Sequence, residues 1–359
     1  MTASRVSAPA VHEPTAHPTH PTLADVAARA GVSGQTVSRV VNGAALVTPQ
    51  TASRVRRVIA EMGYRPNSTA RALKARRSNT IGIVTADSTL YGRTELLFAT
   101  ERAVRAAGYY VSVFSVSEVT RTDVIGAVER LHGQGVEGLV VLCGPSGPEA
   151  DLGMAVDVPT VLTWQAPSSG MSWAAFDQVR GARTVVRHLL SLGHESVAHV
   201  AGPADHPAAA PRRSGWASAL RRAGLPVPEP LTGDWTAASG YAAGQQLARD
   251  PSVTAVFCGN DQMALGVLRA VTEAGRRVPE QVSVAGFDDT ADSAYYSPPL
   301  TTVRQDFRRL GESSVELLRR QLTDPATDRR SSMLSTRVVV RASTGARRAD
   351  AGDPVTVRL

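Results

Sequence analysis

The chain has 359 residues and a formal net charge of +7, with 39 basic and 32 acidic side chains. Residues 1–80 hold eleven of the basic and three of the acidic residues, a balance of +8, whereas the rest of the chain balances to −1. An Arg-rich composition alone would spread the charge evenly, so this excess indicates an N-terminal module that contacts nucleic-acid phosphates. The two cysteines, Cys143 and Cys258, are too few for a disulfide framework or a zinc site, and we expect both to be reduced and buried.

The first twenty residues are rich in Pro, Ala, Thr and His. Such a segment cannot bury a core, so a disordered tail is predicted over 1–20, and its histidines are interpreted as solvated side chains and not as a metal site. The sequence has no signal-peptide pattern, and no window approaches the ~18 apolar residues of a membrane-spanning helix. We therefore expect a cytoplasmic protein with no membrane partner.

Residues 22–42 predict two short helices joined by a tight turn. Apolar residues recur at helical spacing over 23–30 and 35–41, and the segment 31–33 between them is long enough only for a turn. Thr22 and Ser33 are the expected N-caps. Gln can pair with adenine and Arg with guanine, each worth ~1–3 kcal/mol of discrimination. The alternative is a helical hairpin whose polar face is only solvated. The outward residues of the second helix are Gln35, Thr36, Ser38, Arg39 and Asn42.

A third helix is predicted from the cap Thr48 to residue 62, with Pro49 at its first position. It completes a helix-turn-helix headpiece over 21–66, and a basic segment over 67–79 is interpreted as a hinge. In this hinge Leu73 lies among cations, the pattern of a side chain that wedges between base steps in the minor groove. The alternative, an ordinary linker leucine, is disfavoured by the helix-turn-helix upstream.

Two motifs in this region carry a family resemblance. The stretches AxxAGVSxQTVSRVVN at 27–42 and VTxxTxxRVxxxxxEMGYRPNxxARxL at 47–73 resemble the headpiece of the LacI-type family of bacterial transcription regulators, and the likeness extends to about residue 341. The resemblance implies a nucleoid-associated protein that binds double-stranded operator DNA. It places the DNA contacts at Thr22, Ser33, Gly34, Gln35, Thr36, Ser38, Arg39, Asn42 and Tyr64, and in the hinge at Asn67, Ala70 and Leu73.

Strand and helix patterns alternate from residue 80 onward. Strands are predicted at 81–86, 110–115 and 138–142, and helices at 95–107 and 123–134. A second set has strands at 196–201, 255–259 and 283–286, and helices at 179–192, 213–223, 238–249 and 261–275. This alternation predicts an α/β domain over 80–345 with two doubly wound lobes of parallel sheet, like a periplasmic binding protein. A ligand of such a domain lies in the cleft beyond the carboxyl ends of the strands.

Polar residues follow two of these strands, at Asn260-Asp261 and at Asp288-Asp289, and we expect both pairs at the cleft mouth. Arg212 is expected to open a helix below the cleft. The indole of Trp235 is expected to face a sugar ring, although the residue alone is more simply interpreted as part of the core. In sugar-binding members of the family, polar contacts stand at the positions of Arg212, Trp235, Asn260, Asp288 and Gln305, and apolar walls at those of Leu96 and Phe176.

Three first-lobe positions depart from the pattern of such members. A serine, an asparagine and an aspartate are replaced by Ala86, Leu142 and Trp164 respectively. Trp164 is therefore included among the expected effector contacts. The replaced polar groups predict a sugar that is not necessarily lactose-derived: a β-galactoside, a β-glucoside or a plant-type oligosaccharide.

The resemblance and the cleft together predict a repressor of carbohydrate-utilisation genes that a sugar inducer releases from a pseudo-palindromic operator. The alternative is a regulator of the same family that senses a purine or activates transcription. An enzyme is disfavoured, and no cofactor is expected, because the H-E-x-x-x-H at 194–199 is one residue longer than the zinc motif and no nucleotide-binding or hydrolase motif occurs. The tail at 346–359 has no leucine heptads, so a homodimer is predicted.

Overall fold

The computed structural model describes residues 21–41, 43, 46–65, 77–144, 158–163, 170–324 and 330–347. The chain divides after residue 77 into two compact units, and each is described by itself. Some predictions lie outside the described residues: those for the two tails, for most of the hinge, and for Asn42, Asn67, Ala70, Leu73 and Trp164.

The first unit contains the three helices that the sequence predicts: α1 (Leu23–Ala30), α2 (Gly34–Val41) and α3 (Pro49–Met62). The side chains of Thr22 and Thr48 cap α1 and α3 by accepting backbone N–H groups. Gly31 ends α1 with a φ of 61°, a left-handed conformation that glycine adopts without a steric penalty. The apolar faces of the helices meet in a small core around the fully buried Val26, Val37 and Val55.

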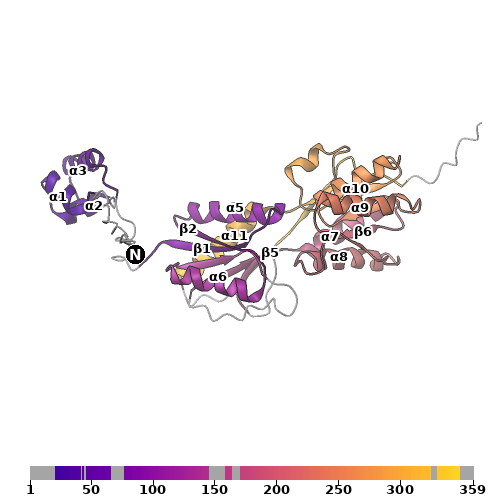
Figure 1. Ribbon diagram of the computed structural model, residues 1–359, viewed down its shortest axis with the longest axis horizontal. Helices are drawn as coiled ribbons and strands as arrows, with labels where there is room; N and C mark the ends of the chain where they lie inside the picture. Colours follow the sequence, from indigo (N-terminus) through magenta and orange to yellow (C-terminus); the bar gives the residue numbers. More distant parts are fainter. Residues whose placement is uncertain are drawn as a thin grey trace, which may run out of the picture. The chain divides into compact units, whose positions relative to one another are not determined.

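The first lobe of the second unit is a parallel sheet in the order β11-β5-β4-β3-β1-β2. Its strands are β1 (Thr80–Ala86), β2 (Tyr110–Val116), β3 (Gly138–Val141), β4 (Thr160–Thr163), β5 (Ser172–Phe176) and β11 (Ser331–Leu334). Its helices are α5 (Tyr91–Ala106), α6 (Arg121–Gly133) and α11 (Phe307–Thr323). Helices α5 and α6 lie on opposite faces of the sheet (Figure 1), and α11 packs beside α5. Both faces of the sheet are thus covered, as a parallel sheet requires.

The second lobe has a smaller parallel sheet in the order β7-β6-β8-β9. Its strands are β6 (Ala198–Ala201), β7 (Leu231–Thr232), β8 (Ala255–Cys258) and β9 (Ser283–Ala285). Helices α7 and α8 pack together, as do α9 and α10. These helices are α7 (Gln178–Ser191), α8 (Ala209–Arg222), α9 (Ala237–Ala248) and α10 (Asp261–Glu273). The sequence suggested that Arg212 opens a helix. Helix α8 in fact begins at Ala209, so Arg212 lies within its first turn.

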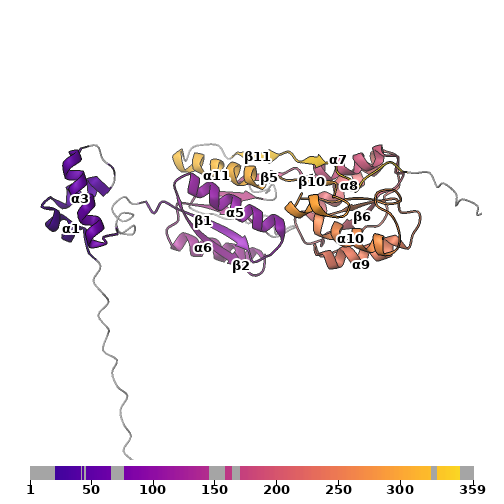
Figure 2. The same ribbon diagram turned by 90° about the horizontal axis from the view of Figure 1, so that it is seen from above.

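The chain crosses between the two lobes three times. It leaves the first sheet after β5, returns after β10 (Thr302–Arg304) through α11 and β11, and crosses again to β12 (Arg337–Val339), which pairs with β10. Figure 2 shows β11 beside β5. The backbone N–H of Asp177 donates to the carbonyl of Leu334 at 2.9 Å, so the first and third crossings are joined. No helix or strand was predicted beyond residue 286, so this return to the first lobe was missed.

Cys143 and Cys258 are buried and free, which confirms the prediction from cysteine count. The two-lobed α/β architecture with parallel sheets is also confirmed. No helix within the described ranges is long and apolar enough to cross a membrane.

Candidate functional site

The face of α2 that the sequence assigns to DNA is shaped by its N-cap. Ser33 Oγ accepts the backbone N–H of Thr36 at 3.2 Å, which fixes where the helix begins. Gln35 is exposed, and the half-buried residues of this face are Gly34, Thr36, Ser38 and Arg39. The first turn of a helix carries partial positive charge, so this end of α2 suits a phosphate and its exposed side chains suit base edges.

Two other residues that the resemblance assigns to DNA support the headpiece itself. Thr22 Oγ1 donates to the carboxylate of Asp25 at 2.7 Å, within the capping box of α1. Tyr64 is 9% exposed and packs against the core of the three helices. Most of its ring is therefore covered by the headpiece.

A cleft with about 360 Å³ of empty space, open to solvent, lies between the lobes of the second unit. Its first-lobe wall is the start of α5, and its second-lobe wall comes from the segments that follow β6, β7, β8 and β9. The lining residues are Leu90, Tyr91, Gly92, Arg93, His206, Ala208, Arg212, Trp235, Asn260, Gln262 and Asp288.

The structure brings together most of the polar effector contacts that the sequence predicts. The four that line the cleft are Arg212, Trp235, Asn260 and Asp288. Gln305 lies behind this wall, with its Nε2 donating to Asp288 Oδ1 at 2.7 Å. Leu96 and Phe176 are not among the lining residues, because both are buried in the core between the first sheet and helices α5 and α11.

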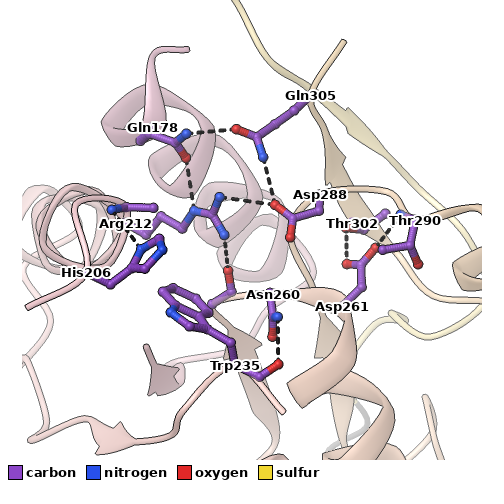
Figure 3. Close-up of polar contacts among 12 residues, drawn as sticks. Gln178, His206, Arg212, Trp235, Asn260, Asp261, Asp288, Thr290, Thr302 and Gln305 are labelled. Carbon is purple, nitrogen blue, oxygen red and sulfur yellow. Dashed lines mark hydrogen bonds and ion pairs between the residues drawn. The ribbon is translucent and has the colours of Figure 1, made fainter. Parts of the chain in front are cut away.

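Arg212 is the centre of the second-lobe wall (Figure 3). Its guanidinium is 3% exposed and donates to Gln178 Oε1 at 2.9 Å, to the carbonyl of Gly259 at 2.5 Å and to Asp288 Oδ1 at 3.1 Å. Burial lowers the pKa of Arg212 and raises that of Asp288, and their ion pair opposes both shifts. A buried pair with this many hydrogen bonds holds both side chains in one geometry before any ligand arrives.

Trp235 is both a core residue and part of the cleft wall. It is 6% exposed and packs with the core on the α9–α10 side of the second sheet. Its indole lies directly on Gly202, where a Cβ atom would be 2.0 Å from the ring, so only glycine fits there. The backbone of Trp235 has a φ of 74°, and its carbonyl accepts from Asn260 Nδ2 at 2.9 Å.

Each acidic or amide pair places its first member in the cleft lining, and the second member has another role. Asp261 is fully buried and accepts from Thr290 N at 2.9 Å and from two hydroxyls, those of Ser293 and Thr302, at 2.5 Å each. Burial, followed by the charge of Asp288, raises the pKa of Asp261 to about 7. Asp289 accepts from Arg341 at 2.6 Å and from Arg304. The carboxylates of Asp261 and Asp289 therefore stabilise the loop after β9, because their hydrogen-bond donors come from the protein itself.

Seven of the lining residues were not predicted as effector contacts, among them Arg93 and His206, and neither was Gln178 behind the wall. Gln178 follows β5, a strand that was not predicted, and its Nε2 donates to Gln305 Oε1 at 2.8 Å. His206 stands edge-on to Trp235 with ring centroids 5.0 Å apart. Arg93 belongs to the first turn of α5, which begins four residues before the predicted start. Gln178 is the second residue after β5, so the rule that polar residues follow a buried strand would have indicated this segment if β5 had been predicted.

Models of two known families match the chain. The bacterial regulatory proteins of the lacI family match residues 22–67, and the periplasmic binding protein-like domain matches residues 186–344. The lactose operon repressor of Escherichia coli strain K12 is 38% identical over 300 residues, which cover 83% of each chain.

Two solved structures are similar over nearly the whole chain. A lac repressor dimer bound to operator and the anti-inducer ONPF superposes with a TM-score of 0.84 at 36% identity, covering 91% of this chain and all of that one. A complex of the transcriptional regulator CelR with cellobiose superposes with a TM-score of 0.65 at 33% identity, covering 90% of this chain and 99% of that one.

Proposed function

The chain belongs to the lacI family of bacterial regulatory proteins, and from this premise we propose that it represses carbohydrate-utilisation genes until a sugar inducer releases it from its operator. The observation that carries the proposal is the preformed polar wall around Arg212 in the same chain as a helix-turn-helix headpiece. The polar wall suits a ligand with several hydroxyl groups, and the headpiece suits DNA.

The headpiece reads DNA through α2. We assign base contacts to Gln35 and Arg39, and backbone contacts to the N-terminal turn around Ser33. Leu73 in the hinge is assigned to the minor groove as an apolar wedge. The operator-bound dimer among the similar structures supports a homodimer on a pseudo-palindromic site, since two headpieces related by a two-fold axis read two half-sites.

The cleft suits a sugar because its fixed groups retain unused hydrogen-bonding capacity. Arg212 has five N–H donors, and within the described residues three of them are engaged. Asp288 receives both of its recorded bonds, from Arg212 and from Gln305, on Oδ1, which leaves Oδ2 for a ligand hydroxyl. The CelR complex with cellobiose supports a β-glycoside in this cleft.

Occupancy reaches the headpiece through the crossings between the lobes. Gln178 follows the first crossing and Gln305 begins the second, and both bond to the Arg212–Asp288 pair. A ligand that reorganises this pair also shifts the crossings, and hence the first lobe from which the hinge emerges. Inducer and operator are therefore coupled without touching each other.

Gel shifts on the palindrome upstream of the protein's own gene, with a panel of glycosides and purines, test the proposal. A β-galactoside or β-glucoside is expected to release the DNA. Release by a purine alone would favour the purine-sensing alternative, and binding only in the presence of a ligand would favour an activator or a co-repressed regulator.

Arg39→Ala tests the base-reading role. It is expected to lose ~1–3 kcal/mol at one base position and little elsewhere. An equal loss across all duplex sequences would instead assign Arg39 to the phosphates.

A further inference from the structure

The first-lobe wall of the cleft carries one charged side chain, Arg93, whose partner is absent from the described part of the chain. It is half-buried at the start of α5 and lines the cleft. Within the described residues no carboxylate bonds to it, whereas the other lining cation, Arg212, is paired with Asp288. The lining residues therefore have an uncompensated positive charge.

His206 faces the same space as a hydrogen-bond donor. The backbone N–H of Ala208 donates to His206 Nδ1 at 3.2 Å, so the proton of the neutral ring is on Nε2. Burial, then the charges of Arg93 and Arg212, lower the pKa of His206 to about 3, which keeps the ring neutral at physiological pH. Its Nε2 is buried and has no partner among the described residues.

Trp235 adds a second donor of the same kind. Its Nε1 is buried without a hydrogen-bond partner in the described residues, although the residue lines the cleft. A buried donor left unpaired costs ~1–3 kcal/mol, so an acceptor on a ligand relieves that cost. Together with Arg93 these side chains offer donors to the ligand, while Asp288 Oδ2 accepts none of the hydrogen bonds found among the described residues.

A neutral sugar can accept from these donors through its hydroxyl oxygens, but it leaves the guanidinium of Arg93 without a counter-charge. A carboxylate or a phosphate ester brings acceptor oxygens alone, and it also neutralises the guanidinium.

We propose that the effector is an anionic glycoside, in which a carboxylate or phosphate group binds Arg93 beside His206 and Trp235 while the hydroxyls bind the Arg212–Asp288 pair. This inference rests on the proposed function, because it names the class of sugar that occupies the same cleft. Arg93 is thus the residue that determines specificity for charge.

Calorimetry on the full-length protein tests the proposal with three matched sets: galactose, galacturonate and galactose 6-phosphate; the corresponding glucose series; and lactose with lactobionate. At least one acid or phosphate is expected to bind about tenfold or more tightly than its neutral counterpart. A preference for the carboxylate or for the phosphate identifies which anion the cleft takes.

Substitutions on α5 locate the effect. Arg93→Gln is expected to abolish the preference for the anion, and Arg93→Lys to restore part of it. Arg102→Gln removes the same charge from an exposed position of the same helix and is the matched control. Thermal melts establish that all three variants fold, which is expected because Arg93 has no ion pair to lose within the described residues.

Equal affinity of the wild type for neutral and anionic members of each set would overturn the inference and leave the proposed function intact. Equal loss in Arg93→Gln and Arg102→Gln would overturn it as well, since the preference would then reflect overall charge. Binding of no sugar in any set would overturn both proposals.

Discussion

The two walls of the effector cleft are built on different principles. The second-lobe wall is a hydrogen-bonded network in which Asp288 accepts from both Arg212 and Gln305. The first-lobe wall offers Leu90, Tyr91 and the cation Arg93, which has no ion pair within the described residues. A wall that is organised in advance binds without a conformational cost, whereas a wall that lacks partners gains them only when a ligand fills the cleft. We therefore expect the second lobe to provide affinity and the first lobe to provide selectivity.

Removal of Arg212 breaks the organised wall most severely. Arg212→Ala leaves Asp288 buried without its cation, so the free energy of unfolding is expected to fall by ~3–5 kcal/mol. Urea denaturation measures this loss. Arg213→Ala is the matched control, because Arg213 is exposed, its pair with Glu229 spans 3.3 Å at the surface, and it should lose less than ~1 kcal/mol. A loss in Arg212→Ala no larger than in the control would mean that the network does not organise the wall.

A methyl group at Gly202 displaces the indole from the same wall. Gly202→Ala is expected to cost ~1–3 kcal/mol of stability and to weaken effector binding, because Trp235 must move out of its site. Tryptophan fluorescence and urea denaturation report the displacement. Gly126→Ala is the control, since no atom lies within 4 Å of its added Cβ, and it is expected to stabilise α6 by ~0.5–1 kcal/mol. Unchanged fluorescence and effector affinity in Gly202→Ala would show that the indole does not need this position.

The charge behind the organised wall makes stability depend on pH. Burial raises the pKa of Asp261 to about 7, above its value in the unfolded chain, so the native state holds the proton more tightly. The contribution of Asp261 to the free energy of unfolding is therefore present in full below the pKa of the unfolded chain, falls between about pH 4 and 7, and is absent above. The free energy of unfolding changes through this group by at most ~1.4 kcal/mol per pH unit.

Asp261→Asn is expected to remove this part of the pH dependence of the free energy of unfolding. The exposed Asp292→Asn should keep the wild-type profile. Profiles of equal slope in both variants would place the titrating group elsewhere.

A substitution in the first-lobe wall is expected to have a smaller effect on stability. Leu90 is half-buried in the cleft and packs against the core on the α9–α10 side of the second lobe. Leu90→Ala is expected to cost about 1 kcal/mol of stability through lost apolar burial. It should also reduce effector affinity by several fold, because closure loses a contact between the lobes. An affinity equal to that of the wild type in calorimetry would show that closure does not use this side chain.

The residues of the cleft also differ in how well the sequence predicts them. Asn260 and Asp288 were predicted because they follow buried parallel strands, whose carboxyl ends meet at one edge of the sheet. The rule places each pair near the cleft, but it cannot tell which of two neighbouring residues lines it: Asn260 or Asp261, and Asp288 or Asp289. Leu96 and Phe176 were assigned through the resemblance, and the structure places both in the core of the first lobe.

Other features depend on contacts that the sequence does not encode locally. Gln178 supports the cleft wall and His206 lines it because distant segments lie against them, Gln305 in one case and Trp235 in the other. The return of the chain through α11 to the first sheet requires the pairing of β11 with β5, which no periodicity reveals. The headpiece was predicted well because its caps, turn and apolar faces are all local signals.

The central claim is that occupancy of the cleft decides how tightly the headpiece holds DNA. It is tested most directly by measuring the dissociation constant of the inducing sugar on the free protein and on the protein saturated with operator. Because binding free energies are reciprocal, the sugar is expected to bind the operator complex more weakly by the same factor by which it weakens operator binding, roughly 5- to 150-fold. An identical sugar dissociation constant with and without operator would contradict the account.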